Sequence, residues 1–508
     1  MKTETEVLIV GGGATGVGLA RDLSLRGVST ALVEKGDFAS GASGRNHGLL
    51  HSGGRYAVSD PVAARECIAE NRILKRIAPH CVEETEGLFV SLPEDGVDFQ
   101  NRFLQACRNA EIPATLLSRD EALHLEPNLH PDILGAVKVP DGAVDPFTLV
   151  VENARDAEAH GARLLPHTTI TSLLVEGKRL RGVTIKDRIT GEEGTIEAPW
   201  VINATGAWAN ELLSLAGLRI GMALSKGTLL VTNHRLTHRV INRCRPPSDG
   251  DIIVPNDAVS ILGTTSVRVK TPEDFLPTTE EVDLLVRETS RMVPQIRDAR
   301  LIRAYAGIRP LFQTEGANDD RQISRGFALI DHGRRDGLHG LITITGGKLI
   351  TYRLMAEKTS DLVCEKMGRP TPCTTHLRPL PGAATRQRFS ERLKKMNRGF
   401  SVEGGEILCD CELIQRNEVG NLLKGQTLRD LQDILHRTRL AKGTCQGGFC
   451  VYRLLGLLHE ARRVEGDSNL VLKQFLEERW RGIRPILWGV AMKEEELIES
   501  IYRGLFNL

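Results

Sequence analysis

A glycine-rich turn between two apolar runs, close to the amino terminus, constrains this chain more than any other feature. Gly11, Gly13 and Gly16 follow the apolar run at 7–10 with the spacing GxGxxG, and a second apolar run ends at Glu34. This pattern predicts a βαβ unit of a dinucleotide-binding fold, in which the glycines let a pyrophosphate approach the start of a helix. A carboxylate at Glu34 can accept hydrogen bonds from a ribose diol.

NAD and FAD share this fingerprint, and three later segments favour FAD. Small residues fill 41–56, the string ATGAW at 204–208 ends an apolar run, and 343–357 is typical of a strand, a glycine turn and a helix. A helix beginning near Leu349 would direct its positive end at the flavin and stabilise the reduced, anionic ring. The predicted FAD contacts in these segments are Ser43, His47, Gly206, Gly346 and Gly347.

Further apolar runs indicate how the chain is divided. The runs at 197–205 and 338–345 are expected to return to the sheet of the βαβ unit. We therefore expect an α/β protein with a β-rich lobe inserted into a Rossmann-type domain. The first expected part is an FAD-dependent oxidoreductase domain at 1–375. Within it, FAD is bound by about 1–75, 145–210 and 325–375, and the substrate lobe consists of about 80–145 and 207–325. A linker at 376–405, a small helical cysteine-bearing domain at 406–460 and a helical tail at 461–508 follow.

Composition excludes several classes of partner. Among 508 residues, 66 Lys and Arg balance 65 Asp and Glu, so the net charge of +1 creates no overall field that attracts nucleic acid. The amino terminus lacks a signal-peptide pattern, and no apolar run approaches the ~18 residues of a bilayer span. We expect a cytoplasmic protein. The basic run within 376–405 is either a solvated face or a docking surface for an acidic partner.

Four of the ten cysteines form two close pairs near the carboxy terminus. Cys409 and Cys411 are separated by one residue, and Cys445 and Cys450 by four. Four thiolates on two tight loops suit either zinc or a [2Fe–2S] cluster, although zinc loops more often use the spacing CxxC. Cysteines that bind no metal or form disulfides are the third interpretation. A helical pattern at 418–439 joins the two loops.

Several uncommon strings occur in a familiar order. GRNHGLLHSGGRYAV at 44–58, RAYAGIRPL at 303–311 and ITGGKLITYRLMAE at 344–357 resemble the FAD-dependent oxidoreductases of the D-amino-acid oxidase and glycerol-3-phosphate dehydrogenase type, especially the respiratory members. The likeness covers nearly the whole chain. The string KGTCQGGFC at 442–450 resembles the [2Fe–2S] domain of the bacterioferritin-associated ferredoxin type, which favours that cluster over zinc.

This resemblance implies an enzyme that oxidises sn-glycerol 3-phosphate to dihydroxyacetone phosphate by hydride transfer to FAD. It further implies that electrons pass through iron–sulfur centres to a membrane quinone. The expected partners in a hetero-oligomer are a second catalytic subunit, together with an iron–sulfur subunit that holds the complex at the cytoplasmic face of the inner membrane. An FAD-dependent amino-acid or 2-hydroxy-acid dehydrogenase or oxidase is the alternative, and an iron–sulfur delivery module with a structural flavin lobe is a third interpretation.

The resemblance also assigns residues. Arg309 and Lys348 occupy positions that the family uses for substrate, and Arg55 and Tyr56 match another family contact. For the catalytic base we expect His51, with His47 as its rival, because imidazole titrates near working pH. One departure concerns the pair Lys226-Gly227, which Thr228 follows where aerobic single-chain relatives carry a histidine. The base or the closure of the site can therefore differ from theirs.

Overall fold

The predicted βαβ unit is present, and its strands lie in the middle of a six-stranded sheet. The computed structural model describes residues 2–312, 326–384, 391–394, 406–425, 428, 430–462 and 467–508. The strand order is β10-β3-β2-β14-β22-β21, and all pairs are parallel except β21 with β22. The strands are β2 (Val7–Val10), β3 (Thr30–Val33), β10 (Arg163–Leu165), β14 (Trp200–Asn203), β21 (Phe327–Asp331) and β22 (Leu341–Gly346).

Both faces of this sheet are covered, which explains its continuous apolar strands. Alternate side chains such as Ile9 and Ile202 pack against the helices α1 (Ala14–Leu25), α6 (Pro146–Ala159) and α10 (Tyr352–Lys366). The intervening side chains, such as Leu8 and Val201, pack against a four-stranded sheet. That sheet has the order β1-β13-β12-β11 and consists of β1 (Lys2–Glu4), β11 (Thr168–Glu176), β12 (Arg179–Asp187) and β13 (Glu193–Glu197).

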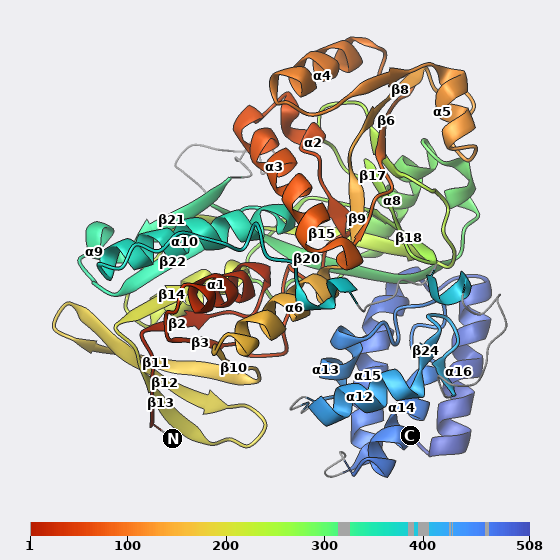
Figure 1. The fold of residues 1–508 in the computed structure, drawn as a ribbon. Helices are drawn as coiled ribbons and strands as arrows, with labels where there is room; N and C mark the ends of the chain where they lie inside the picture. The colour runs from red at the N-terminus through yellow and green to blue at the C-terminus, as the bar shows by residue number, and fades with distance from the viewer. Residues whose placement is uncertain are drawn as a thin grey trace.

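The inserted lobe contains a nine-stranded sheet, drawn above the first sheet in Figure 1. Its strands are β6 (Gly87–Ser91), β7 (Thr115–Leu117), β8 (Gly135–Val139), β15 (Met222–Thr232), β16 (Val240–Arg243), β17 (Ile252–Asn256), β18 (Val259–Gly263), β19 (Val267–Val269) and β20 (Leu301–Phe312). They come from the two segments predicted for the lobe. The lobe helices are α4 (Asp98–Asn109), α5 (Arg119–Leu125) and α8 (Thr279–Ser290). Strand β20 pairs with β15 along its whole length and carries Arg309 toward the first sheet.

The remaining short elements connect the lobe to the first sheet. A three-stranded sheet consists of β4 (Leu49–Leu50), β5 (Val82–Glu83) and β9 (Gly142–Val144). The helices α2 (Gly54–Ala57) and α3 (Pro61–Ile77) lie between β4 and β5 in the chain, while α7 (Ala209–Ser214) follows β14 and α9 (His332–Arg335) precedes β22. The mixed α/β class that the sequence predicts is confirmed.

The cysteine-bearing segment folds as a small helical module beside β20 and α6 (blue in Figure 1). Its elements are β23 (Ile407–Cys409), β24 (Ile414–Gln415), α12 (Arg416–Gly425), α13 (Leu431–Arg437) and α14 (Cys450–Glu460). The helical pattern at 418–439 therefore forms two helices. A new helix begins because Asp430 caps it, accepting the backbone N–H of Gln432. Much of the predicted linker, at 385–390 and 395–405, lies outside the described residues.

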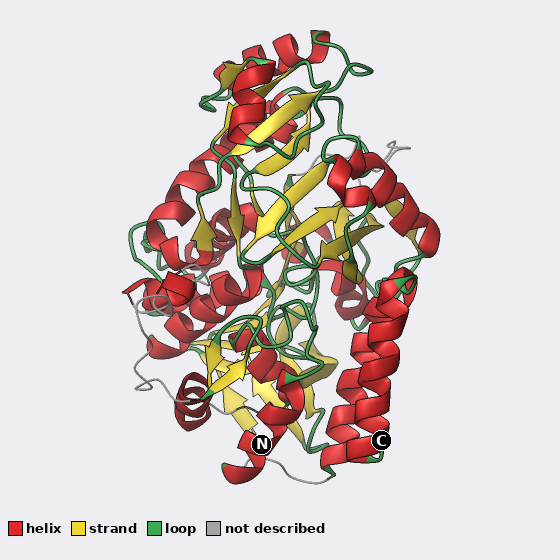
Figure 2. Ribbon diagram, turned by 90° about the vertical axis from the view of Figure 1, so that its right-hand side faces the viewer, coloured by secondary structure: helices red, strands yellow, loops and turns green. Residues whose placement is uncertain are grey.

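The tail forms two helices, α15 (Ser468–Ile483) and α16 (Val490–Phe506), which share an apolar core with the module. Figure 2 shows both chain termini at the same end of the molecule. The sequence predicts that Trp480 and Trp488 are either core residues or contacts to a partner; at 45% and 48% exposed, they do not lie in the core. A contact to a partner stays a prediction. No helix in the described ranges is both long and apolar enough to cross a bilayer.

Ion pairs join the module to the segments that follow strands of the six-stranded sheet. Asp37, which follows β3, is bonded to His436 at 2.7 Å and to Arg437 at 2.9 Å. His167 is 2.9 Å from Asp433. Burial opposes the protonation of His167, but the hydrogen bond and charge of Asp433 outweigh it and raise its pKa. These partners are buried or part-buried, so the contacts hold the module against the sheet.

Candidate functional site

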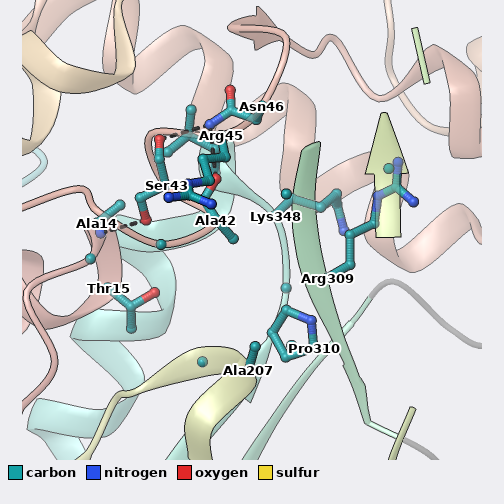
Figure 3. Close-up of a pocket in the computed structure, with 18 of the residues that line it drawn as sticks. Ala14, Thr15, Ala42, Ser43, Arg45, Asn46, Ala207, Arg309, Pro310 and Lys348 are labelled. Atoms are coloured by element: carbon teal, nitrogen blue, oxygen red, sulfur yellow. Dashed lines mark hydrogen bonds between the residues drawn. The ribbon is translucent and has the colours of Figure 1, made fainter. Parts of the chain in front are cut away.

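A cavity of about 1270 Å³ lies between the six-stranded sheet and the inserted lobe. Apart from Gly16, every residue that the sequence assigns to FAD or substrate lines it; these are Gly11, Gly13, Glu34, Ser43, His47, His51, Arg55, Tyr56, Gly206, Arg309, Gly346, Gly347 and Lys348. Figure 3 shows Ala14 and Thr15 at the start of α1 on one side, with Arg309 and Lys348 on the other. One elongated space therefore joins the dinucleotide turn to the cationic side chains.

The dinucleotide end of the cavity is built by close backbone approaches. A Cβ on Gly16 would lie 1.8 Å from the carbonyl oxygen of Gly11, so this glycine sets the path of the turn beneath the cavity. A Cβ on Gly13 would meet only the side chain of Ser43, whose hydroxyl would lie at 3.0 Å. That hydroxyl accepts the backbone N–H of Ala14 at 2.9 Å (Figure 3). The first turn of α1 thus presents N–H groups and a partial positive charge to the cavity.

Glu34 lies beside this turn, where the sequence places it. Its carboxylate accepts the backbone N–H groups of Gly12 at 2.6 Å and Gly36 at 2.8 Å. Burial raises the pKa of this carboxyl, whereas the two N–H groups lower it. The bonds fix the orientation of the carboxylate. Gly346 and Gly347, at φ of +82° and +69°, end β22, and the helical turn after them begins at Leu349 as expected.

Substitutions of Gly13 and Gly16 test how each glycine contributes to the dinucleotide end of the cavity. In Gly13→Ala, whose φ of −75° suits alanine, we expect an unchanged melting temperature of the FAD-free protein. The added methyl group occupies the place of the pyrophosphate, so FAD affinity should fall about 100-fold. Gly16→Ala should instead destabilise the FAD-free fold by about 3 kcal/mol. Thermal unfolding and FAD titration measure both. Equal melting losses in the two variants would contradict this division of roles.

The cationic end of the cavity contains Arg309, Lys348 and Arg55. Arg309 donates to the backbone oxygen of Thr265 at 3.1 Å and to the Thr264 hydroxyl. Its guanidinium fills the space over Gly227, where a Cβ would lie 2.2 Å from Nη2. The glycine of the Lys226-Gly227 pair therefore admits the arginine. The Nζ atom of Lys348 lies 4.9 Å from the centroid of the Tyr56 ring.

Arg55 forms an ion pair with Asp251, a residue that no sequence pattern predicts. Asp251 is fully buried and accepts Arg55 Nη2 at 2.7 Å, Arg245 at 2.8 Å and the Ser248 N–H at 2.6 Å. In contrast, Nη1 of Arg55 is buried and has no hydrogen-bond partner in the described chain. This nitrogen is shielded from water, so Arg55 meets the cavity through the rest of its side chain.

Two histidines lie between the dinucleotide turn and the cations. The ring centroids of His47 and His51 are 5.9 Å apart, and His51 lies 5.5 Å from Tyr56. Burial, with the charge of Arg309 next in importance, lowers the pKa of His47 to about 3. Burial, His47 and Arg55 lower the pKa of His51 well below its usual value. Both rings are therefore neutral at neutral pH and have a nitrogen that can accept a proton.

The structure distinguishes the two histidines. Nδ1 of His47 accepts the backbone N–H of Leu49 at 3.2 Å, so the remaining proton of the neutral ring is on Nε2 and His47 acts as a donor. Thr228, which follows the Lys226-Gly227 pair, is buried in β15. Of the two candidates named from the sequence, His51 fits a proton acceptor better.

The four carboxy-terminal cysteines come together in the module. Hydrogen bonds from Cys411 and Cys450 lower the pKa of Cys445, and the N–H groups of Phe449 and Gly447 act in the same direction. A hydrogen bond from Cys450 likewise lowers the pKa of Cys409. All four are free thiols. The disulfide interpretation therefore has no support from the fold.

The four thiols contact one another in a chain, in the order Cys411, Cys445, Cys450 and Cys409. Among the described residues, no group of three or more His, Cys, Asp or Glu side chains is arranged to hold one metal ion. Cys411 also lies 3.3 Å from the hydroxyl of Thr444. The arrangement thus offers four sulfur atoms and several backbone N–H donors, which is the donor set of a thiolate-bound group.

Comparison with known proteins agrees with this cavity. Residues 6–353 match the family model "FAD dependent oxidoreductase". The chain is similar to one subunit of the anaerobic glycerol-3-phosphate dehydrogenase of Escherichia coli strain K12, with 46% identity covering 99% of this chain and 97% of that protein. It is similar to the corresponding subunit of the Haloferax volcanii enzyme, with 43% identity covering 100% and 91%.

Solved structures share the fold. The glycerol-3-phosphate dehydrogenase from Bacillus halodurans complexed with FAD has a TM-score of 0.67 at 23% identity, covering 96% of each chain. Glycine oxidase from Geobacillus kaustophilus has a TM-score of 0.60 at 23% identity, covering 74% of this chain and 98% of its own. At these identities the likeness concerns the fold.

Proposed function

The chain belongs to the FAD-dependent oxidoreductase family, and on that basis we propose that it oxidises sn-glycerol 3-phosphate to dihydroxyacetone phosphate. The relatives that carry the name of this activity match the chain from end to end. The observation that carries the proposal is that Arg55, Arg309 and Lys348 line the same cavity. Three cationic groups in one part-buried site suit a phosphate dianion.

The residues present fit FAD. The positive end of α1, whose first residues line the cavity, suits its pyrophosphate, and Glu34 suits its ribose. When bound, FAD supplies the acceptor for the hydride that leaves the carbinol carbon. Ser43, Gly206 and the pair Gly346–Gly347 line the same space and would orient the cofactor.

Different side chains of the cavity bind the phosphate of the substrate and accept the proton of its hydroxyl group. Arg309 and Arg55 hold the phosphate through paired N–H groups, and Lys348 adds a point charge. Tyr56 lies between Lys348 and His51 and limits the space beside the carbinol. His51, neutral at working pH, accepts the hydroxyl proton. His47 donates a hydrogen bond from Nε2 and orients its neighbours.

Anaerobic addition of sn-glycerol 3-phosphate to the purified holoprotein tests this proposal. We expect bleaching of the flavin absorbance within the turnover time, and much slower bleaching with glycerol, which lacks the phosphate. An amino acid or a 2-hydroxy acid that bleaches the flavin faster than glycerol 3-phosphate would favour the alternative member of the family. Flavin that no phosphorylated alcohol reduces in intact holoprotein would overturn the proposal.

We further propose that Cys409, Cys411, Cys445 and Cys450 hold a [2Fe–2S] cluster. Four thiols on two tight loops, with the backbone N–H groups of Gly447 and Phe449 beside them, suit two irons that take two thiolates each. Such a cluster passes electrons one at a time. Iron and acid-labile sulfide near two each per chain would support this assignment, whereas zinc without sulfide would overturn it.

The wider assembly is also a proposal. The relatives are named as single subunits of an anaerobic enzyme, which supports a hetero-oligomer that also contains a second catalytic subunit, along with an iron–sulfur subunit. We propose that the iron–sulfur subunit holds the complex at the cytoplasmic face of the inner membrane and that a quinone is the final acceptor. Co-purification of native complexes from membranes and from the soluble fraction tests this arrangement.

Asp251 gives a separate prediction about positioning. In Asp251→Asn, Arg55 loses its buried counter-charge and its fixed orientation. We expect the KM for glycerol 3-phosphate to rise about tenfold, equal to roughly 1.4 kcal/mol, with kcat little changed. Asp95→Asn is the matched control, because Asp95 pairs with Arg243 in the same region and does not contact Arg55. An equal effect on phosphate-free glycerol would refute this role.

A further inference from the structure

A second cavity, of about 670 Å³, lies between the segment after β3 of the six-stranded sheet and the cysteine-bearing module. Arg45 and Asn46 separate it from the first cavity and line both. Its other walls come from β20, from the module and from the tail helix α15. The volume falls in the range of small-molecule sites, which form preferentially where two domains meet.

Three guanidinium groups line this cavity, and two of them share one carboxylate. Arg303 on β20 lies 3.6 Å from Glu478 on α15, and Arg481 on the same helix lies 3.3 Å from it. The guanidinium of Arg45 makes no hydrogen bond or ion pair within the described parts of the chain. It lies 4.0 Å from the centroid of the Phe275 ring. The cations therefore exceed the carboxylates around them.

The other charged groups do not remove this excess. Arg439, on the opposite wall, has its own carboxylates in Glu412 and Asp145, and Arg479 is paired with Glu495. Glu477 and Asp430 also line the cavity but are exposed to solvent, and Asp37 is paired with His436 and Arg437. Burial lowers the pKa of Arg45, and the charges of Arg303 and Arg481 add to this effect against that of Glu478. Guanidinium groups nevertheless stay charged in proteins, so an anion would stabilise them.

Aromatic rings form much of the remaining wall. Phe147 stacks on His436, with their ring centroids 4.8 Å apart, and Tyr305 donates its hydroxyl proton to the backbone oxygen of Asn46 at 2.8 Å. Phe275 and Phe475 line the cavity as well. His436 and Lys442 both lie against the Phe147 ring. The apolar surfaces of Phe275, Phe475 and Tyr305 are therefore the part of this wall that suits a ligand combining a ring with an anionic group.

We propose that this cavity binds a mononucleotide-sized organic anion, whose phosphate group is held by Arg45, Arg303 and Arg481 and whose ring lies against the aromatic wall. The ligand would contact three separate parts of the chain. Its binding would therefore fasten the module and α15 to the flavin-binding part. The site does not depend on the proposed substrate, which occupies the other cavity.

Calorimetric titration of the FAD-loaded protein with AMP, adenosine and inorganic phosphate, at constant ionic strength, tests this proposal. AMP carries both the ring and the phosphate, and each of the other probes carries one of them. We expect AMP to bind at least about tenfold more tightly than either, because both walls contribute. Equal affinity for AMP and phosphate would overturn the assignment of the aromatic wall, and with it the proposed ligand class.

Variants locate the site. Arg303→Gln and Arg481→Gln should each weaken AMP binding about 10- to 100-fold. Arg503→Gln is the matched control, since Arg503 lies on α16 with its side chain 72% exposed. It should bind AMP like the wild type. Arg481→Gln keeps the test valid if Arg303→Gln does not fold, because the side chain of Arg481 is 57% exposed.

Arg309→Gln distinguishes the two cavities. If AMP binding falls in Arg309→Gln and is unchanged in Arg303→Gln and Arg481→Gln, AMP occupies the substrate cavity and the proposal is overturned. The reverse pattern supports it. The titration requires no turnover, so a failure of glycerol 3-phosphate oxidation would be seen separately, in the flavin absorbance.

Discussion

Arg309→Ala should lower kcat/KM for sn-glycerol 3-phosphate by about three orders of magnitude, equal to roughly 4 kcal/mol, within the usual cost of removing one partner of a buried, hydrogen-bonded charge pair. The guanidinium is fixed before substrate arrives, because Thr265 accepts its N–H groups and Gly227 leaves it room. Little ordering entropy is then lost on binding.

Two further variants show which property of Arg309 matters. Arg309→Lys keeps the charge but loses the planar fork, so we expect an intermediate loss. Gly227→Ala keeps the arginine but displaces its guanidinium, which a Cβ would approach to 2.2 Å. It should therefore reproduce much of the loss. Steady-state kinetics with glycerol as the phosphate-free reference measures the effect. If Arg309→Ala slows glycerol as much as glycerol 3-phosphate, Arg309 does not bind the phosphate.

Local patterns predict the part of the site that depends on the path of the backbone. GxGxxG with its flanking apolar runs gives β2, α1 and β3, because each step follows from spacing and strand propensity. Gly346, Gly347 and Leu349 likewise begin the predicted helical turn. The role of Gly227 is different, since its neighbour Arg309 belongs to a strand that lies far along the chain. Only the strand pairing of β15 with β20 shows why glycine is required there.

Contacts between distant segments account for what local patterns could not show. Asp251 belongs to no recognisable string, and its contact with Arg55 depends on how the lobe packs against α2. Similarly, nothing in the sequence distinguishes Asp37 from other acidic residues that follow a strand. Its role becomes visible only in the fold, where it pairs with His436 and Arg437 of the module. The second cavity is lined by segments from across the chain, so no local pattern indicates it.

His51→Asn should slow flavin reduction by glycerol 3-phosphate by about 10²- to 10⁴-fold, the usual contribution of a general base, while FAD and substrate still bind. Rapid mixing without oxygen measures the rate constant, and its dependence on substrate concentration gives the affinity. His47→Gln is the matched control, because it keeps a side-chain amide that can donate. A larger loss in His47→Gln than in His51→Asn would exchange the two roles.

The pH dependence gives an independent test of His51 as the base. Burial and the charges of His47 and Arg55 lower its pKa, so the folded protein keeps His51 neutral as the pH falls through 6.5. The rate constant of flavin reduction should therefore stay level between about pH 8 and pH 6. The unfolded chain takes up the proton in this range, so His51 should also make the folded state less stable as the pH falls. In Arg55→Gln one lowering charge is gone, and we expect the rate to begin its acid-side decline at a higher pH. An unchanged acid limb in that variant would mean that another group accepts the proton.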